Sequence, residues 1–108
     1  MPHYLIEVAY NSGGVAALVK EPQDRIEKVR PPIEALGGHI ESAYYAFGEH
    51  DIVLTVEMPS NTAAAAMALA VGAGGTVSSY TTTVLLTPEE AMQAMSQAAE
   101  SVYRPATG

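Results

Sequence analysis

Hydrophobic residues recur at every second position near the start of the chain. Tyr4, Ile6, Val8 and Tyr10 fall on one side of an extended segment. A period of two predicts a strand, because successive side chains of a strand point to opposite faces. Runs rich in Val, Thr and Tyr give similar signals further along. The predicted strands cover 3–10, 39–47, 51–57 and 76–86.

The segment between the first two predicted strands has a helical spacing instead. Hydrophobic residues recur at i, i+3, i+7 and i+10 from Ile26 to Leu36, which predicts one buried stripe. Pro31 and Pro32 interrupt this stripe, and we expect a kink there rather than a helix end. Near the carboxyl end, residues 87–90 combine a capping threonine, a first-turn proline and a capping-box glutamate. The predicted helices cover 15–20, 22–36, 62–71 and 88–102.

The predicted elements follow one another as βαββαβ with a terminal helix, in a single domain of 108 residues. Each βαβ half joins two parallel strands by a right-handed crossover. The result is an α+β fold of the ferredoxin-like type, a four-stranded antiparallel sheet with its helices on one face. Residues 105–108 are expected to form a frayed tail.

The sheet face away from the helices decides the expected assembly. Because strand faces alternate, two sets of hydrophobic residues must point in opposite directions. We assign to the helix-covered face Tyr4, Ile6, Val8, Ile40 and Tyr44. We assign to the other face Leu5, Ala9, Ala43, Tyr45 and Phe47. A largely apolar second face predicts a partner sheet, and so a homodimer or larger homo-oligomer through the sheet faces.

Charge and composition exclude several classes of protein. The net charge of −7 argues against nucleic-acid binding, which needs a basic surface to displace counterions from phosphates. The chain has no cysteine, which excludes disulfides, zinc–thiolate sites and a cysteine nucleophile. Its longest apolar run, 63–74, is shorter than the roughly 20 residues of a membrane-spanning helix. With no secretory signal at the start, we expect a cytoplasmic protein without a membrane partner.

The best candidates for acid–base chemistry lie in and near the turn between the second and third predicted strands. Glu49 and Asp51 flank His50, and a neighbouring carboxylate can orient an imidazole and raise its pKa. Glu7 and Glu57, on strands that should be central neighbours, are further candidate bases, in a pocket near Tyr44 or Tyr80. Other interpretations remain open: Asp51 caps the turn while His50 faces solvent, and Glu7 points to water or pairs across an oligomer interface.

Histidine spacing gives little support to a metal site. His3, His39 and His50 could be combined with Glu41, but no two histidines have the close spacing of a helical or hairpin ligand pair. His39 and Glu41 share only the i, i+2 spacing of one strand. We therefore expect no metal and no cofactor.

The turn at 48–53 also carries a family resemblance. Its sequence Gly-Glu-His-Asp-Ile-Val resembles the glycine turn of the GYD-domain family, which usually has Gly-x-Tyr-Asp; Gly48 and Asp51 match, and His50 replaces the aromatic residue. Further similar segments are 4–6, 25–27, 36–38, 68–70 and 82–87. The family consists of small bacterial and archaeal proteins. The resemblance implies a ferredoxin-like fold of the dimeric α/β-barrel type and no assigned activity.

Two functions of different classes fit the sequence. The first is an oligomeric, non-enzymatic module that binds a small molecule or serves assembly, favoured because no catalytic motif stands out. The alternative is a cofactor-free enzyme, such as a small monooxygenase or isomerase, with a pocket between sheet and helices. Its acid–base groups would be His50, Glu7 or Tyr44. Such an enzyme requires a closed cavity that holds a group with a strongly shifted pKa.

Overall fold

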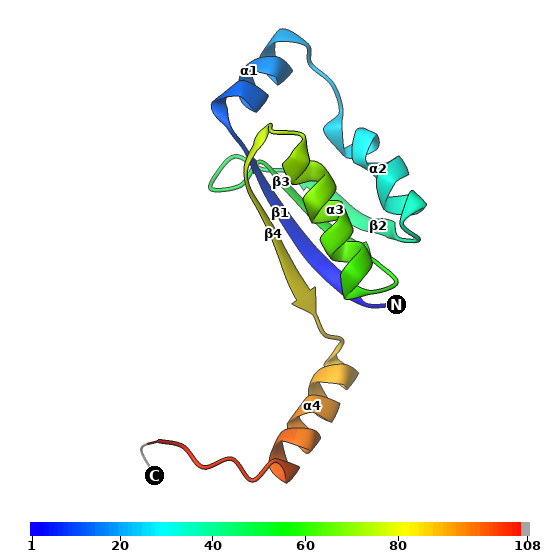
Figure 1. The fold of residues 1–108 in the computed structure, drawn as a ribbon, viewed down its shortest axis with the longest axis vertical. Helices are drawn as coiled ribbons and strands as arrows, with labels where there is room; N and C mark the ends of the chain where they lie inside the picture. Colours follow the sequence, from blue (N-terminus) through cyan, green and yellow to red (C-terminus); the bar gives the residue numbers. More distant parts are fainter. Residues whose placement is uncertain (107–108) are drawn as a thin grey trace.

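The computed structural model describes residues 1–106, and it shows one four-stranded sheet with helices packed on one side (Figure 1). The elements are β1 (His3–Tyr10), α1 (Ser12–Lys20), α2 (Arg25–Ala35), β2 (His39–Tyr45), β3 (Ile52–Glu57), α3 (Asn61–Ala73), β4 (Val77–Leu85) and α4 (Pro88–Glu100). The strand order across the sheet is β2-β3-β1-β4, and each neighbouring pair is antiparallel. The predicted α+β architecture of the ferredoxin-like type is confirmed.

The core lies between the sheet and helices α2 and α3. Alternate residues of the central strands point into it, and the helices add a few apolar side chains. The buried residues of these elements are Tyr4, Ile6, Val8, Ile26, Ile33, Ile52, Leu54, Val56, Ala64 and Met67. The helical stripe predicted for α2 is confirmed at Ile26 and Ile33, because both side chains are buried against the strands.

Side-chain caps decide where the first two helices begin, and both starts differ from the prediction. Asn11 accepts a hydrogen bond from a backbone amide of the first turn of α1 (2.8 Å), so this helix begins at Ser12 rather than at residue 15. Asp24 accepts hydrogen bonds from two amides of the first turn of α2. The second helix therefore begins after Pro22 rather than at it.

The proline pair lies inside α2 without ending it, as predicted. The helix runs through Pro31 and Pro32 to Ala35. The chain then turns at Gly37, whose φ of 88° favours glycine. A Cβ atom on Gly38 would collide with the Met58 side chain and the backbone carbonyl of Glu57, so this glycine lets the chain between α2 and β2 lie close to the end of β3.

A β-bulge in β2 reverses the predicted faces of that strand. The register against β3 shifts within 40–42, and Glu41 is the extra residue. Beyond the bulge, Tyr44 points away from the helices, whereas Tyr45 accepts a hydrogen bond from the first backbone amide of α2 (2.7 Å) and Ala43 packs against the core. The assignment of these three residues to their faces is therefore wrong, because simple alternation does not allow for an extra residue.

The sheet face without helices, called the open face below, is also more polar than predicted. Only a few large apolar side chains lie on it. By strand register, its residues are His3, Leu5, Glu7, Ala9, His39, Ser42, Tyr44, Val53, Thr55, Glu57, Ser79, Thr81, Thr83 and Leu85. The expectation of a largely apolar second face is wrong, because β2 and β4 place mainly Ser, Thr, Glu and His there. Phe47, which we placed on it, lies in the connection after β2 and is fully exposed.

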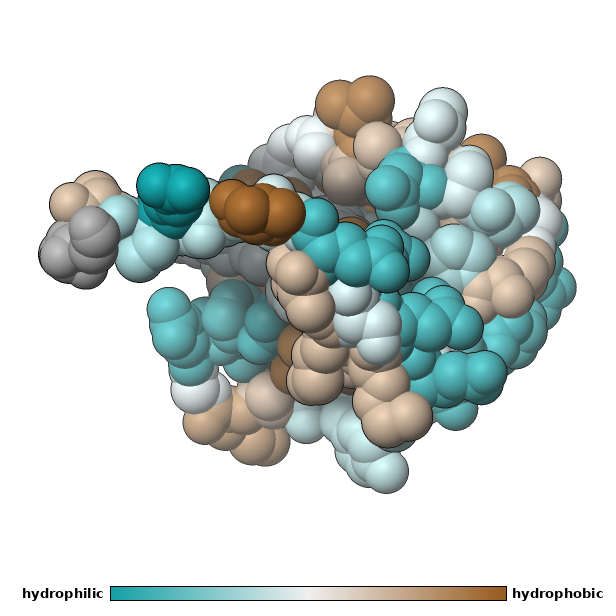
Figure 2. Space-filling model, turned by 90° about the horizontal axis from the view of Figure 1, so that it is seen from below, coloured by the Kyte–Doolittle hydropathy of each residue, from teal (hydrophilic) through white to brown (hydrophobic). Residues whose placement is uncertain are grey.

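The last helix, α4, projects from the body of the molecule (Figure 1). The molecule including this helix measures 57 × 33 × 22 Å. Its predicted capping box is present at 87–90, but none of its residues is buried. Met92 and Met95 are 63% and 67% exposed. Figure 2 looks up at this end of the molecule, where hydrophobic and hydrophilic residues lie side by side.

Two further expectations were a frayed tail at 105–108 and the lack of a membrane-spanning helix. Of the predicted frayed tail at 105–108, residues 105–106 belong to no helix or strand, and 107–108 lie outside the described residues. Within 1–106, no helix combines the length and the hydropathy needed to cross a membrane.

Candidate functional site

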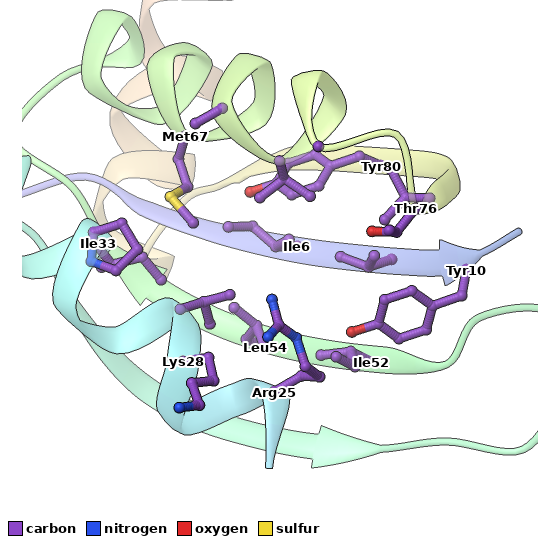
Figure 3. A pocket seen from close by; sticks show the side chains of 17 residues that line it. Ile6, Tyr10, Arg25, Lys28, Ile33, Ile52, Leu54, Met67, Thr76 and Tyr80 are labelled. Carbon is purple, nitrogen blue, oxygen red and sulfur yellow. The ribbon is translucent and has the colours of Figure 1, made fainter. Parts of the chain in front are cut away.

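A cavity of about 240 Å³ lies between α2, α3 and the helix-covered face of the sheet (Figure 3). Its walls are largely apolar. The strands contribute side chains such as Ile6 and Leu54, and the two helices contribute Ile33 and Met67. Helix α3 also contributes Ala70 to the lining, a small side chain that leaves room between the helix and the sheet.

A few polar side chains also line this cavity. They are Tyr10, Arg25, Lys28, Thr76 and Tyr80. Burial raises the pKa of the Tyr80 phenol to about 12. Burial raises the pKa of Tyr10 as well, against the opposing effect of Arg25. Both phenols therefore stay neutral at physiological pH and can donate a hydrogen bond. Arg25 and Lys28 of α2 also line the cavity; Figure 3 shows Arg25 on the side of Tyr10 and the Lys28 amino group pointing away from the phenols.

The sequence candidates His50 and Glu7 come together on the open face. His50 Nδ1 lies 3.4 Å from Glu7 Oε2, and the two side chains are 22% and 28% exposed. The turn before β3 carries the imidazole back over β1, where Glu7 points away from the core. This pair could exchange a proton with a molecule on the open face.

Asp51 does not join this pair. Its carboxylate accepts a hydrogen bond from the backbone amide of Tyr10 (2.8 Å), and its own amide donates to the carbonyl of Val8 (2.8 Å). Asp51 thus ties the start of β3 to the end of β1. This arrangement supports a structural role for Asp51.

Tyr44 lies on the open face in the same row as Glu7. The register across the sheet is Tyr44, Val53, Glu7 and Thr81, so a whole strand separates the phenol from the carboxylate. Tyr44 is 70% exposed. The three proposed acid–base residues therefore lie on one side of the sheet, and the cavity under the helices lies on the other. The structure therefore does not bring these acid–base residues and the cavity together.

A second group of ionisable side chains lies at another place on the open face. His3 Nδ1 is 2.9 Å from Glu41 Oε1 and 3.7 Å from Glu57 Oε1, and His39 Nε2 is 3.8 Å from Glu57 Oε2. One ligand atom each of His3, Glu41 and Glu57 lie within 4.8 Å of one another. These are residues that could hold a metal ion.

From the sequence, His3, His39 and Glu41 were metal candidates only in combination with His50, and Glu57 was not among them. The signal that finds Glu57 is strand register, since it pairs with His3 on one side and with His39 on the other. The hydrogen bond with Glu41 is the main cause that raises the pKa of His3, and burial opposes it.

The sequence profile of the GYD domain matches residues 4–95, so the chain belongs to the GYD-domain family, whose function is unassigned. The match covers all of the sheet except His3 and extends into α4. No curated protein matches the chain.

Proposed function

We propose that this member of the GYD-domain family is a homo-oligomeric module that binds a small, largely apolar anion in the cavity between its helices and its sheet. The observation that carries the proposal is the apolar cavity of about 240 Å³ with two cationic side chains and two neutral phenols in its lining. Binding pockets of this kind combine apolar walls with a few polar groups that orient the ligand.

The size of the cavity limits the ligand. Pockets for drug-sized molecules occupy about 300–1,000 Å³, whereas a cavity of about 150 Å³ holds benzene. A volume of about 240 Å³ therefore suits a substituted single ring or a short acyl chain.

The polar lining favours a carboxylate as the head group. Arg25 and Lys28 place positive charge on the α2 side of the cavity in a chain whose net charge is −7. Arginine can bind a carboxylate through two parallel hydrogen bonds. The neutral phenols of Tyr10 and Tyr80 can each donate a further hydrogen bond. An aromatic or short aliphatic carboxylic acid meets all of these requirements.

A thermal-shift and NMR screen of small carboxylic acids, each paired with its primary amide, tests this ligand class. The acids should bind more tightly than their amides, and Arg25→Gln with Lys28→Gln should remove that preference. Ala70→Phe places a ring at the cavity wall and should abolish binding, whereas Leu69→Phe, on the neighbouring exposed residue, should not. Equal binding of acids and amides, or binding unaffected by Ala70→Phe, would count against the proposal.

The oligomer rests on a separate observation, the projecting helix α4. A helix of 13 residues is marginal in water without tertiary contacts, yet α4 buries none of its side chains within this chain. Exposed apolar residues continue from β4 into the helix, at Val84, Leu86, Met92 and Met95. A second copy that packs against α4 and the adjoining end of β4 would bury this surface.

Sedimentation and native mass spectrometry test the oligomer directly. The unmodified protein should be a dimer or larger, and Met92→Glu with Met95→Glu should yield monomers. The matched control, Gln93→Glu with Gln97→Glu, adds the same charge to other positions of α4 and should leave the oligomer intact. A monomeric unmodified protein would overturn this part of the proposal.

The contact between His50 and Glu7 favours a second candidate function, a cofactor-free enzyme that transfers protons on the open face. Turnover in a screen of aromatic and lactone-like substrates should then be lost in both His50→Gln and Glu7→Gln. Asp51→Asn, whose carboxylate serves the backbone, should retain it. Turnover that survives His50→Gln would exclude this candidate.

A further inference from the structure

We propose that His3, Glu41, Glu57 and His39 form a binding site for Zn²⁺, or for a first-row divalent metal ion of similar preference, on the open face of the sheet. Nothing in the proposed ligand-binding function requires this site. It lies on the face of the sheet opposite the cavity, and it uses none of the cavity residues.

The separations between donor atoms fit a small tetrahedral ion. Zn²⁺ binds imidazole nitrogen and carboxylate oxygen at about 2.0–2.2 Å, which places neighbouring ligand atoms of a tetrahedron roughly 3.3–3.6 Å apart. The observed separations are 2.9 Å from His3 to Glu41, 3.7 Å from His3 to Glu57 and 3.8 Å from His39 to Glu57. The first two separations bracket the required value, and one ligand atom each of His3, Glu41 and Glu57 lie within 4.8 Å of one another. His39 approaches the other oxygen of Glu57, so its side chain would have to turn toward these three donors to complete the shell.

Strand register explains how residues far apart in the sequence form one cluster. His39, Glu57 and His3 are directly opposite one another on β2, β3 and β1, so their side chains stand in one row across the open face. Glu41 is the extra residue of the bulge in β2. Its side chain reaches over β3 to His3 beside Thr55, a residue with which it shares a surface hollow. The bulge thereby adds a fourth donor to a row of three.

The surroundings of the cluster leave room for an ion and its water. His3, Glu41 and Thr55 line a shallow hollow of about 270 Å³, which the start of the connection to α4 closes on one side at Leu86 and Thr87. The His3, Glu41 and Glu57 side chains are between 24% and 32% exposed, so the donors are accessible without being fully solvated. Two carboxylates and two neutral imidazoles would balance the charge of one divalent cation.

The chemistry of the donors selects among metals. Mixed imidazole and carboxylate donors suit Zn²⁺ and its neighbours in the first transition row, whereas Mg²⁺ and Ca²⁺ prefer oxygen alone. The site should therefore discriminate strongly between Zn²⁺ and Mg²⁺.

Titration calorimetry with ZnCl₂ on untagged, chelator-treated protein tests the site. We expect one Zn²⁺ per chain, with no comparable heat from MgCl₂. His3→Gln and Glu57→Gln should each weaken binding by at least about tenfold, since even residues that only support metal ligands cost about 10–100-fold when changed. Bound Co²⁺ should give the visible absorption band of a four- or five-coordinate ion, and this band should vanish in both variants.

His50→Gln is the matched control, because His50 also contacts a glutamate on the open face but lies near no third donor among the described residues. Zn²⁺ affinity should be unchanged in this variant. Circular dichroism of each variant establishes that the fold is retained. Absence of saturable binding by the unmodified protein, or equal losses in His50→Gln and His3→Gln, would overturn the assignment.

Discussion

The two faces of the sheet consist of the same strands and have opposite chemistry. In β1, Ile6 is 2% exposed under the helices, whereas the next residue, Glu7, points to the open face and contacts His50. The covered face lines an apolar cavity with neutral phenols, and the open face carries two groups of histidine and glutamate side chains. The alternation of side chains along each strand thus gives this small domain two surfaces of different chemistry.

Truncation of a core side chain should have the largest effect and separates the two faces most clearly. Ile6→Ala should lower the free energy of unfolding by about 2–5 kcal/mol, because it removes buried methyl groups and leaves a cavity. Leu5→Ala, one residue away on the open face, should lower it by less. Urea unfolding followed by circular dichroism measures both. If Ile6→Ala fails to fold, Ile6→Val should still cost about 0.5–1.5 kcal/mol. A greater loss for Leu5→Ala would contradict the comparison.

Removal of the Asp51 carboxylate should have the next largest effect. Asp51→Ala should destabilise the protein by about 1–3 kcal/mol, since it leaves the Tyr10 amide without its charged acceptor. His50→Ala removes only a partly exposed contact and should cost less than about 1 kcal/mol. The same urea experiment compares the two neighbours. Equal losses would remove the distinction between a structural aspartate and a histidine available for chemistry.

The buried phenol of Tyr80 should make the covered face sensitive to high pH. Burial raises its pKa to about 12, above the ordinary tyrosine value of about 10. Above pH 10 the unfolded chain therefore loses this proton more readily than the folded protein, and stability should fall as the pH rises. A phenolate absorbance titration of Tyr10→Phe should show one late transition, and this transition should be missing when Tyr80→Phe is added. A late transition that persists in the double variant would contradict the assignment.

The smallest effect concerns His3 on the open face. Unlike the Tyr80 phenol, its side chain is charged when it is protonated. Its pKa is raised above 6.5, chiefly by the hydrogen bond with Glu41. The stabilisation that protonated His3 contributes is complete below about pH 6.5 and is lost as the pH rises through the folded-state pKa. NMR titration in the presence of a chelator should show the raised pKa, and Glu41→Gln should lower it. A His3 pKa that Glu41→Gln does not change would mean that the contact is absent in solution.

Much of the fold follows from local signals in the sequence. The strand at 3–10, the stripe of α2 and the capping box at 87–90 were all predictable, because each depends on residues close together in the chain. The starts of α1 and α2 were harder to predict from the sequence, because nearby glycine and proline residues also indicate where a helix begins or ends. The bulge at Glu41 was not predictable, because it exists only in the pairing with β3.

For the candidate sites, too, some features follow from the sequence and others only from the tertiary structure. The sequence alone determined the period of the first strand, which sets Glu7 on the face opposite Ile6, and it placed His50 in a turn. Only the tertiary structure decided which side chains meet: His50 with Glu7, Asp51 with the Tyr10 amide, and Glu57 with both His3 and His39. The cavity is likewise a result of how far two helices stand apart over the sheet. The physical reason is that hydrogen bonds and packing between strands are long-range contacts, whose partners no local pattern specifies.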